Sequence, residues 1–272
     1  MDSELSSVID IAYQAGARLA EHFHHKARPV HLKEDQTLVT EADLAVDRLI
    51  TQSLMTQFPA DGIISEEIHH HLPSIHERVW IVDPLDGTTN FSIGVPIWGV
   101  SIARVTGGYP DLAVVYFPMQ KELFTAENGK GAWLNNTYLR VSQPEVEEPA
   151  AFFSCCSRTH RKYDITIRYK TRILGSACYS MCAVARGMAL ISFEATPKLW
   201  DLAAVWLIIQ ESGRCVETYD GSTLFPIREN LDYRCIDFPT LSAATQELMA
   251  YARQNIRRKD VPGEGVPSDP RC

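Results

Sequence analysis

One short segment restricts the fold more than any other feature of this chain of 272 residues. It runs from Trp80 to Phe91 and reads Trp-Ile-Val-Asp-Pro-Leu-Asp-Gly-Thr-Thr-Asn-Phe. The run over 79–83 is apolar and rich in β-formers, which predicts a buried strand. Pro84 favours extended backbone at the residue before it, and the chain then has to turn sharply. Asp83 and Asp86 can therefore converge on one point at the end of a strand.

The residues after this acidic pair are suited to binding an anion. A helix or turn that begins at Thr88 would present free backbone N–H groups, and Gly87 allows a ligand to approach closely. Carboxylates beside an anion site need a cation between them, and Mg²⁺ commonly bridges carboxylates to phosphate. The simpler alternative is that Asp83 and Asp86 only cap a turn, because Asp-Gly after Pro is a common turn sequence. The length of the whole string favours the metal-phosphate interpretation.

Two further acidic segments belong with this one. Glu66 and Glu67 follow an apolar pair, although such a pair alone would usually be a solvated loop. Asp201 stands at the start of an otherwise apolar helix, where its plainer function is that of an N-cap. Together the three segments predict acidic side chains that meet around shared divalent ions.

The periodicity of apolar residues predicts an α+β first half and an α/β second half that pack as one compact unit. A first helix is expected over 4–24, and Thr40 begins a second helix with a capping-box pattern. An antiparallel meander is expected over 98–106, 111–117 and 121–126. Further expected elements are strands over 151–155 and 172–174 and helices over 176–187, 201–212 and 241–254. The predicted divisions are 1–145, 146–256 and a disordered tail, 257–272, that is rich in Pro and Gly.

Composition excludes several classes of partner. The formal net charge is −8, so the chain does not readily form a broad surface that neutralises nucleic-acid phosphates. No segment approaches about 18 consecutive apolar residues, so no membrane partner is expected. The N-terminal residues are acidic and polar and lack the pattern of a signal peptide, which predicts a cytoplasmic protein.

The motifs together resemble the inositol monophosphatase family. The resemblance rests on Trp80 to Phe91, on the Trp200–Ala204 string followed by Gly213, on the glutamate pair, and on Leu38 to Asp43; it covers about residues 4–255. It implies a layered αβαβα sandwich of the inositol monophosphatase and fructose-1,6-bisphosphatase type. It also implies a homodimer and inhibition by lithium.

The resemblance further implies a set of metal ligands. Two or three Mg²⁺ ions would be held by Glu66, Asp83, the Leu85 carbonyl, Asp86 and Asp201. Glu66 and Thr88 would orient and deprotonate the attacking water. Asp43 would hold a third ion through water, although Asp43 is also the fourth member of the capping box.

Substrate contacts follow from the same resemblance. Gly87, Thr88 and Thr89 would bind phosphate oxygens. The organic part would be contacted by Gly175, Ser176, Ala177, Glu194 and Asp201. For Glu194 the alternative is an exposed charge near a strand end. The three consecutive histidines over 69–71 are interpreted as a solvated loop, because successive side chains diverge along the backbone.

The expected activity is Mg²⁺-dependent hydrolysis of a small phosphomonoester without a covalent intermediate. Within the family that the motifs resemble, Thr89-Asn90-Phe91 is similar to the members that act on inositol phosphates, so the resemblance implies inositol monophosphate as substrate. Fructose 1,6-bisphosphate, histidinol phosphate, adenosine 3′,5′-bisphosphate and NADP remain alternatives. A different class of function is a catalytically silent sugar-phosphate sensor or a partner of RNA machinery that kept the fold. A phosphotransferase is disfavoured, because no Gly-rich P-loop or kinase signature is present.

Overall fold

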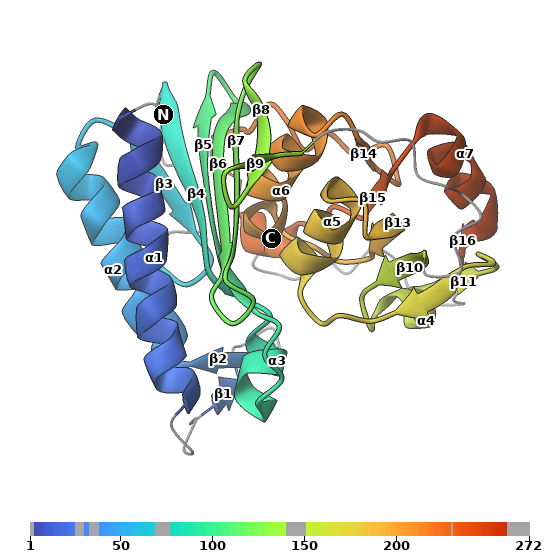
Figure 1. Ribbon diagram of the computed structural model, residues 1–272, viewed down its shortest axis with the longest axis horizontal. Helices are drawn as coiled ribbons and strands as arrows, with labels where there is room; N and C mark the ends of the chain where they lie inside the picture. Colours follow the sequence, from blue (N-terminus) through green and yellow to red (C-terminus); the bar gives the residue numbers. More distant parts are fainter. Residues whose placement is uncertain are drawn as a thin grey trace.

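The computed structural model describes residues 3–24, 30–32, 38–68, 77–139, 151–229 and 231–259. Its helices and sheets form five layers (Figure 1). Helices α1 (Ser3–His24) and α2 (Glu41–Gln57) cover one face of a seven-stranded sheet. Helices α5 (Ala177–Ala185) and α6 (Leu199–Glu211) lie between this sheet and a five-stranded sheet, and α7 (Gln246–Asn255) packs outside the second sheet. The predicted αβαβα sandwich is confirmed.

The larger sheet has the strand order β3-β4-β5-β6-β7-β8-β9. The strands are β3 (Gly62–Ser65), β4 (Arg78–Asp86), β5 (Gly99–Thr106), β6 (Tyr109–Phe117), β7 (Glu122–Glu127), β8 (Gly131–Leu134) and β9 (Thr137–Tyr138). Strand β3 is parallel to β4, and all the other pairs are antiparallel. The predicted meander is therefore confirmed in β5, β6 and β7.

Strand β4 is buried on both of its faces. Trp80 and Val82 pack into the core shared with α1 and α2. Val79 and Ile81, which alternate with them, pack into the core shared with α5 and α6. A strand covered by helices on both sides requires a continuous apolar run, and this explains the composition of 79–82. The run carries the strand straight to the acidic residues that follow it.

The smaller sheet has the strand order β12-β10-β13-β15-β14. The strands are β10 (Phe152–Cys155), β12 (Lys170–Arg172), β13 (Ala189–Glu194), β14 (Cys215–Thr218) and β15 (Thr240–Ala243). Strands β12, β10 and β13 are parallel neighbours, whereas β13, β15 and β14 pair antiparallel. The helix expected over 241–254 begins later, because residues 240–243 form a fully buried strand and Thr245 caps α7. The strand expected over 172–174 lies at 170–172 instead.

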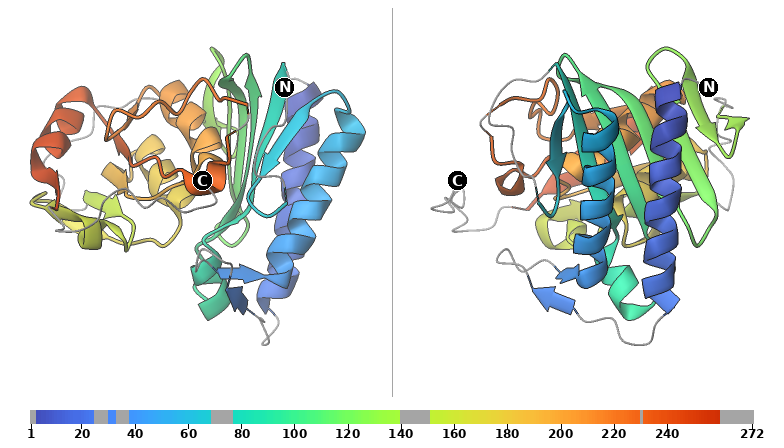
Figure 2. Two further views of the ribbon diagram at one scale, coloured as in Figure 1. Left: turned by 180° about the vertical axis from the view of Figure 1, so that it is seen from behind. Right: turned by 90° about the vertical axis from the view of Figure 1, so that its left-hand side faces the viewer.

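Short elements complete the chain, and Figure 2 shows them from two further sides. They are β1 (Val30–Leu32), β2 (Leu38–Thr40), α3 (Thr88–Ile93), α4 (Thr159–Lys162), β11 (Tyr163–Ile165), the 3₁₀ helix Tyr233–Cys235 and β16 (Ile256–Arg258). Strand β16 corrects the expected start of the disordered tail, because it pairs antiparallel with β11 and the Tyr219 hydroxyl donates to the Ile256 carbonyl at 2.6 Å. Residues 260–272 lie outside the described residues. Among the described helices, none combines the length and apolar character needed to cross a bilayer.

Candidate active site

The end of β4 places two buried aspartates on either side of a sharp turn. The ladder between β4 and β5 is irregular between Asp83 and Asp86, and the Leu85 N–H donates to Asp83 Oδ1 at 3.0 Å. Gly87 follows with φ of +92°, and a Cβ atom there would lie 2.9 Å from the Ile97 carbonyl oxygen. Only glycine avoids both the left-handed strain and this clash. The turn therefore leads directly into α3 at Thr88, as the sequence predicts.

A third aspartate reaches the same point from α6. One carboxylate oxygen from each of Asp83, Asp86 and Asp201 lies within 4.8 Å of the others. Asp201 occupies the first turn of α6, where its Oδ2 accepts a hydrogen bond from the Lys198 N–H at 2.7 Å. Asp201 thus has both predicted functions, because its side chain caps α6 and also belongs to the carboxylate cluster.

Helix α5 holds Asp86 with its N-terminus. The Ser176 hydroxyl donates to Asp86 Oδ2, and the Ala177 N–H donates to Oδ1 at 3.0 Å. Ser176 also caps α5, since its oxygen accepts from the Tyr179 N–H at 2.9 Å. The structure thus places two of the predicted substrate contacts against a carboxylate of the cluster.

Burial and mutual repulsion raise the pKa of each carboxyl group in this cluster. Burial is the largest cause for Asp83, followed by the charges of Glu66 and Asp201, and it raises the pKa well above 3.8. Burial raises the pKa of Asp86 to about 6, and burial together with Glu66 raises that of Asp201 to about 7. Within the described residues, Asp83 Oδ2 is buried without a hydrogen-bond partner. Such a set of hard oxygen donors fits a divalent cation, which would relieve both the burial penalty and the repulsion.

Glu66 approaches the cluster from the neighbouring strand. It directly follows β3, and its N–H donates to the Val82 carbonyl at 3.1 Å. Because β3 and β4 are parallel, this bond places Glu66 beside Asp83, and its charge contributes to the raised pKa of Asp83 and Asp201. Glu66 is not part of the group whose oxygens lie within 4.8 Å of one another.

Thr88 links the cluster to α2. Its hydroxyl lies 3.2 Å from Asp43 Oδ1 and 3.1 Å from the Leu85 carbonyl oxygen, both of which are acceptors. The other oxygen of the buried Asp43 accepts from the Thr40 N–H at 2.8 Å and completes the predicted capping box. One oxygen of Asp43 therefore caps α2 while the other faces the site.

Glu194 ends β13 and is buried, so the alternative of an exposed charge is wrong. Burial is the main cause that raises its pKa, followed by Cys156 and Asp86, while a hydrogen bond with Ser180 acts in the opposite sense. Its Oε1 atom is buried without a hydrogen-bond partner in the described part of the chain. The carboxyl group thus offers an acceptor beside the aspartate cluster.

Two residues near the site were not predicted from sequence. The amide of Asn90 donates to the carbonyls of Ile97 at 2.8 Å and Leu174 at 2.7 Å, which ties α3 to the segment before α5. Cys156 follows β10 and accepts from the Ala195 N–H at 3.4 Å, next to Glu194. Asn90 belongs to the Trp80–Phe91 string, but its bond to Leu174 spans 84 residues and no sequence pattern indicates it. The predicted loop over 69–71 lies outside the described residues.

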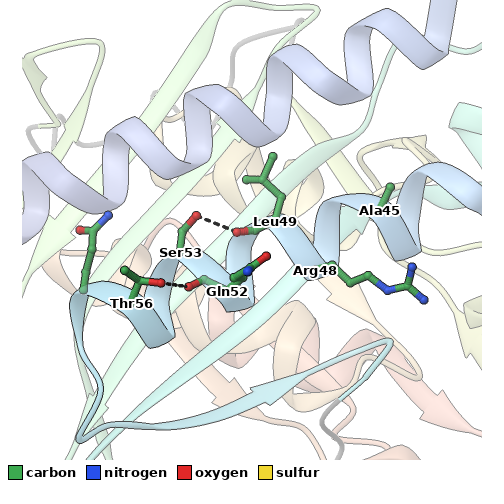
Figure 3. A pocket seen from close by; sticks show the side chains of 7 residues that line it. Ala45, Arg48, Leu49, Gln52, Ser53 and Thr56 are labelled. Carbon is green, nitrogen blue, oxygen red and sulfur yellow. Dashed lines mark hydrogen bonds between the residues drawn. The ribbon is translucent and has the colours of Figure 1, made fainter.

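Two hollows of the described surface lie away from this cluster. One, of about 570 Å³, runs along α2 (Figure 3) and is lined by Ala45, Arg48, Leu49, Gln52, Ser53, Thr56 and Gln57. The hydroxyls of Ser53 and Thr56 donate back to carbonyls of their own helix, so neither proton is available to a ligand there. The other, of about 560 Å³, includes Tyr109 and Phe225 and also lacks the clustered carboxylates. The chemistry is therefore assigned to the carboxylate cluster.

Comparison with known proteins agrees with this geometry. A profile of the inositol monophosphatase family matches residues 1–257. The chain belongs to the inositol monophosphatase family. Its relatives include a histidinol-phosphatase of Chlorobaculum parvum, 35% identical over 81% of this chain and 88% of the relative, and the Nus factor SuhB of Salmonella typhimurium, 32% identical over 85% and 91%. An IMPase structure from Thermotoga maritima has a TM-score of 0.76 and 26% identity, covering 93% of this chain and 98% of that one.

Membership in the inositol monophosphatase family assigns the chain to the phosphoric monoester hydrolases. The family consists of metal-dependent phosphatases, and the carboxylate cluster supplies a matching set of metal donors. The family that the sequence motifs resemble, the fold and the class of reaction are thus confirmed.

Proposed function

We propose that this chain hydrolyses a small phosphomonoester with the help of Mg²⁺, and that inositol monophosphate is its best substrate. The observation that carries the proposal is the meeting of Asp83, Asp86 and Asp201 within 4.8 Å, beside the Gly87 turn that begins α3. Two buried carboxylates and one half-buried carboxylate, all of raised pKa, cost stability unless a cation accompanies them. Their convergence next to the first residues of α3 supports binding of a metal and a phosphate together.

The proposed metal ligands are Glu66, Asp83, the Leu85 carbonyl, Asp86 and Asp201. When bound, Mg²⁺ supplies positive charge for the phosphate and leaving oxygens and makes a bound water more acidic. Two ions are proposed at these ligands, with a third that Asp43 would hold through water.

The residues of this chain then position the reactants. The Thr88 hydroxyl lies between two acceptors and can donate to Asp43 or to the Leu85 carbonyl. Its oxygen can at the same time accept a hydrogen bond from a water molecule and so hold that water in place. Glu66 is proposed to accept the proton of that water, because a threonine hydroxyl is too weak a base to do so. Backbone N–H groups of Gly87, Thr88 and Thr89 are proposed to bind phosphate oxygens.

The organic part of the substrate is proposed to lie against Glu194. The unpartnered, buried Oε1 atom can accept a hydrogen bond from a hydroxyl of a polyol, which supports inositol. Gly175, Ser176 and Ala177 are proposed to line the same side. An ammonium group would also satisfy Glu194, so the histidinol-phosphatase relative supports histidinol phosphate as the second candidate.

A panel of phosphomonoesters assayed with Mg²⁺ and with EDTA tests the proposal. The panel consists of inositol 1-phosphate, histidinol phosphate, fructose 1,6-bisphosphate, adenosine 3′,5′-bisphosphate and NADP. We expect phosphate release with Mg²⁺, greatest from inositol 1-phosphate, and none with EDTA or in Asp83→Asn. Release that persists in EDTA would contradict the metal function.

The same panel separates the catalytic proposal from the silent alternative. Relatives named Nus factor SuhB support a non-catalytic sensor or regulatory partner, and absence of release from every substrate would favour that function. We further propose a cytoplasmic homodimer that lithium inhibits. Light scattering tests the homodimer, and activity in lithium chloride tests the inhibition.

A further inference from the structure

Three buried serines form a row across the smaller sheet, one on each of three neighbouring strands. Ser192 of β13 is in register with Ser154 of β10 on one side and with Ser242 of β15 on the other. The exposed fractions of Ser154, Ser192 and Ser242 are 0%, 1% and 0%. These three residues, the serine row, therefore lie entirely inside the protein.

The serine row faces α5. The residues on either side of each serine along its strand belong to the core shared with α7; they are Phe153, Cys155, Ile191, Phe193, Leu241 and Ala243. Side chains alternate between the two faces of a strand, so the serines point to the opposite face, where α5 contacts β13 and β15 (Figure 1). Glu194 lies on this same face, two residues after Ser192, and hydrogen-bonds Ser180 of α5. The serine row thus extends from the active site into the interior.

None of the three hydroxyls has a hydrogen-bond partner among the described residues. Side chains in register on adjacent strands are about 5 Å apart, whereas two hydroxyls that bond directly are about 2.7 Å apart. One water molecule between such hydroxyls can bond both, because two hydrogen bonds of about 2.8 Å span that separation. The buried Oε1 atom of Glu194 also lacks a partner in the described part of the chain. Four buried oxygens without partners thus lie on one face of one sheet.

The simpler alternative is that the serines are only small residues that let α5 pack closely on the sheet. Alanine is smaller still and would allow the same approach without burying a hydroxyl. A buried hydroxyl with no partner is unfavourable, and a row of them adds to that cost. Ordered water relieves the cost, since a buried water molecule typically bonds about three polar groups. The chemistry of the serine row therefore favours bound water over dry packing.

We propose that the serine row holds a chain of buried water molecules that continues to Glu194 and fixes the orientation of its carboxyl group. One water bridges Ser154 and Ser192, and a second bridges Ser192 and Ser242. From Ser192 the chain reaches Glu194 Oε1 over roughly 7 Å along the strand. A carboxyl oxygen has two acceptor sites, so Oε1 can bond this water and a substrate hydroxyl together. The water chain is independent of the proposed function, whereas its effect through Glu194 on substrate binding rests on that function and makes Ser192 a positioning residue.

Magnetic relaxation dispersion of water ¹⁷O counts the water molecules that stay buried for long times, and it tests the chain directly. Valine adds methyl groups where the waters would lie, so we expect Ser192→Val to lose about two long-lived waters. Ser192→Ala should lower Tm by about 2–4 °C, because the waters lose a partner. Ser212→Ala is the control, since Ser212 is also buried but its hydroxyl donates to the Ile209 carbonyl at 2.8 Å. The control should leave the number of long-lived waters unchanged.

Steady-state kinetics test the effect on Glu194. With Mg²⁺ and inositol 1-phosphate, Ser192→Val should raise KM about 3- to 10-fold and change kcat less than about twofold, because a hydroxyl contact is made before and during the reaction alike. An unchanged KM would overturn the effect on Glu194. An unchanged number of long-lived waters in Ser192→Val, or a higher Tm in Ser192→Ala, would overturn the water chain, because a dry row gains stability when an unpaired hydroxyl is removed. If Ser192→Val does not fold, the sign of the Tm change in Ser192→Ala decides. Wild-type protein that releases no phosphate would overturn the proposed function instead, while the water count still decides the chain.

Discussion

Replacing Asp201 by asparagine should stabilise the metal-free protein while it abolishes activity. The asparagine side-chain oxygen can still accept the hydrogen bond from the Lys198 N–H, so the cap of α6 survives. What disappears is a half-buried negative charge that is repelled by Glu66 and Asp86. The variant therefore separates the electrostatic cost of the cluster from its structural function.

The expected size and sign follow from the pKa of Asp201. Burial raises the pKa from 3.8 to about 7, and a difference of about 3 corresponds to about 4 kcal/mol. The folded state binds more protons than the unfolded state between these values, so stability falls as the pH rises from about 4 to about 7. Because the carboxyl groups of Asp83, Asp86 and Asp201 lie within 4.8 Å of one another, part of this cost passes to the remaining carboxylates. We expect Asp201→Asn to gain about 1–3 kcal/mol at pH 8 in EDTA and little at pH 4.

Urea unfolding at pH 4, 6 and 8, with EDTA and with Mg²⁺, measures this difference. Asp10→Asn is the control, because Asp10 is exposed on α1 and its replacement removes the same charge far from the cluster. In Mg²⁺ the order should reverse, since the wild type gains stability from the ion and the variant gains less. An Asp201→Asn protein that is less stable than wild type in EDTA at pH 8 would refute the electrostatic reasoning.

Three further predictions test the site and its support. Thr88→Ala should lower kcat by at least about 10²-fold while Thr88→Ser keeps most activity, because the hydroxyl is the functional group; steady-state phosphate release decides this. Gly175→Ala should cost about 1–3 kcal/mol in urea unfolding, because φ is +77° and the new Cβ would lie 2.5 Å from Asn90 Oδ1; unchanged stability would contradict the close approach. Burial tends to raise the pKa of Glu4, but hydrogen bonds from Arg78 and Arg104 outweigh it and lower the pKa. Glu4→Gln should therefore cost about 1 kcal/mol at pH 7 and nearly nothing once the pH falls well below 4.5, as measured by unfolding at both pH values.

The sequence predicts best where the signal is local. Helices α1 and α2, the run into β4 and the turn at Gly87 depend on apolar spacing and on the backbone preferences of neighbouring residues. The capping box at Thr40 is of the same kind, since both of its partners lie within one turn. The boundaries near 240 were wrong because β15 is buried on both faces and shows no alternation, and a buried strand cannot then be told from a helix by periodicity.

The sequence by itself was enough to find the acidic segments and the family that they indicate, because each segment is a continuous stretch of chain with its own turn residues. Only the tertiary structure decided that Asp201 meets Asp83, that Ser176 binds Asp86, and that Glu194 is buried. These side chains lie on separate elements, and their distances depend on how two sheets pack around α5 and α6. The serine row is of the same kind, because strands that are distant in the chain leave no sequence pattern that shows their register.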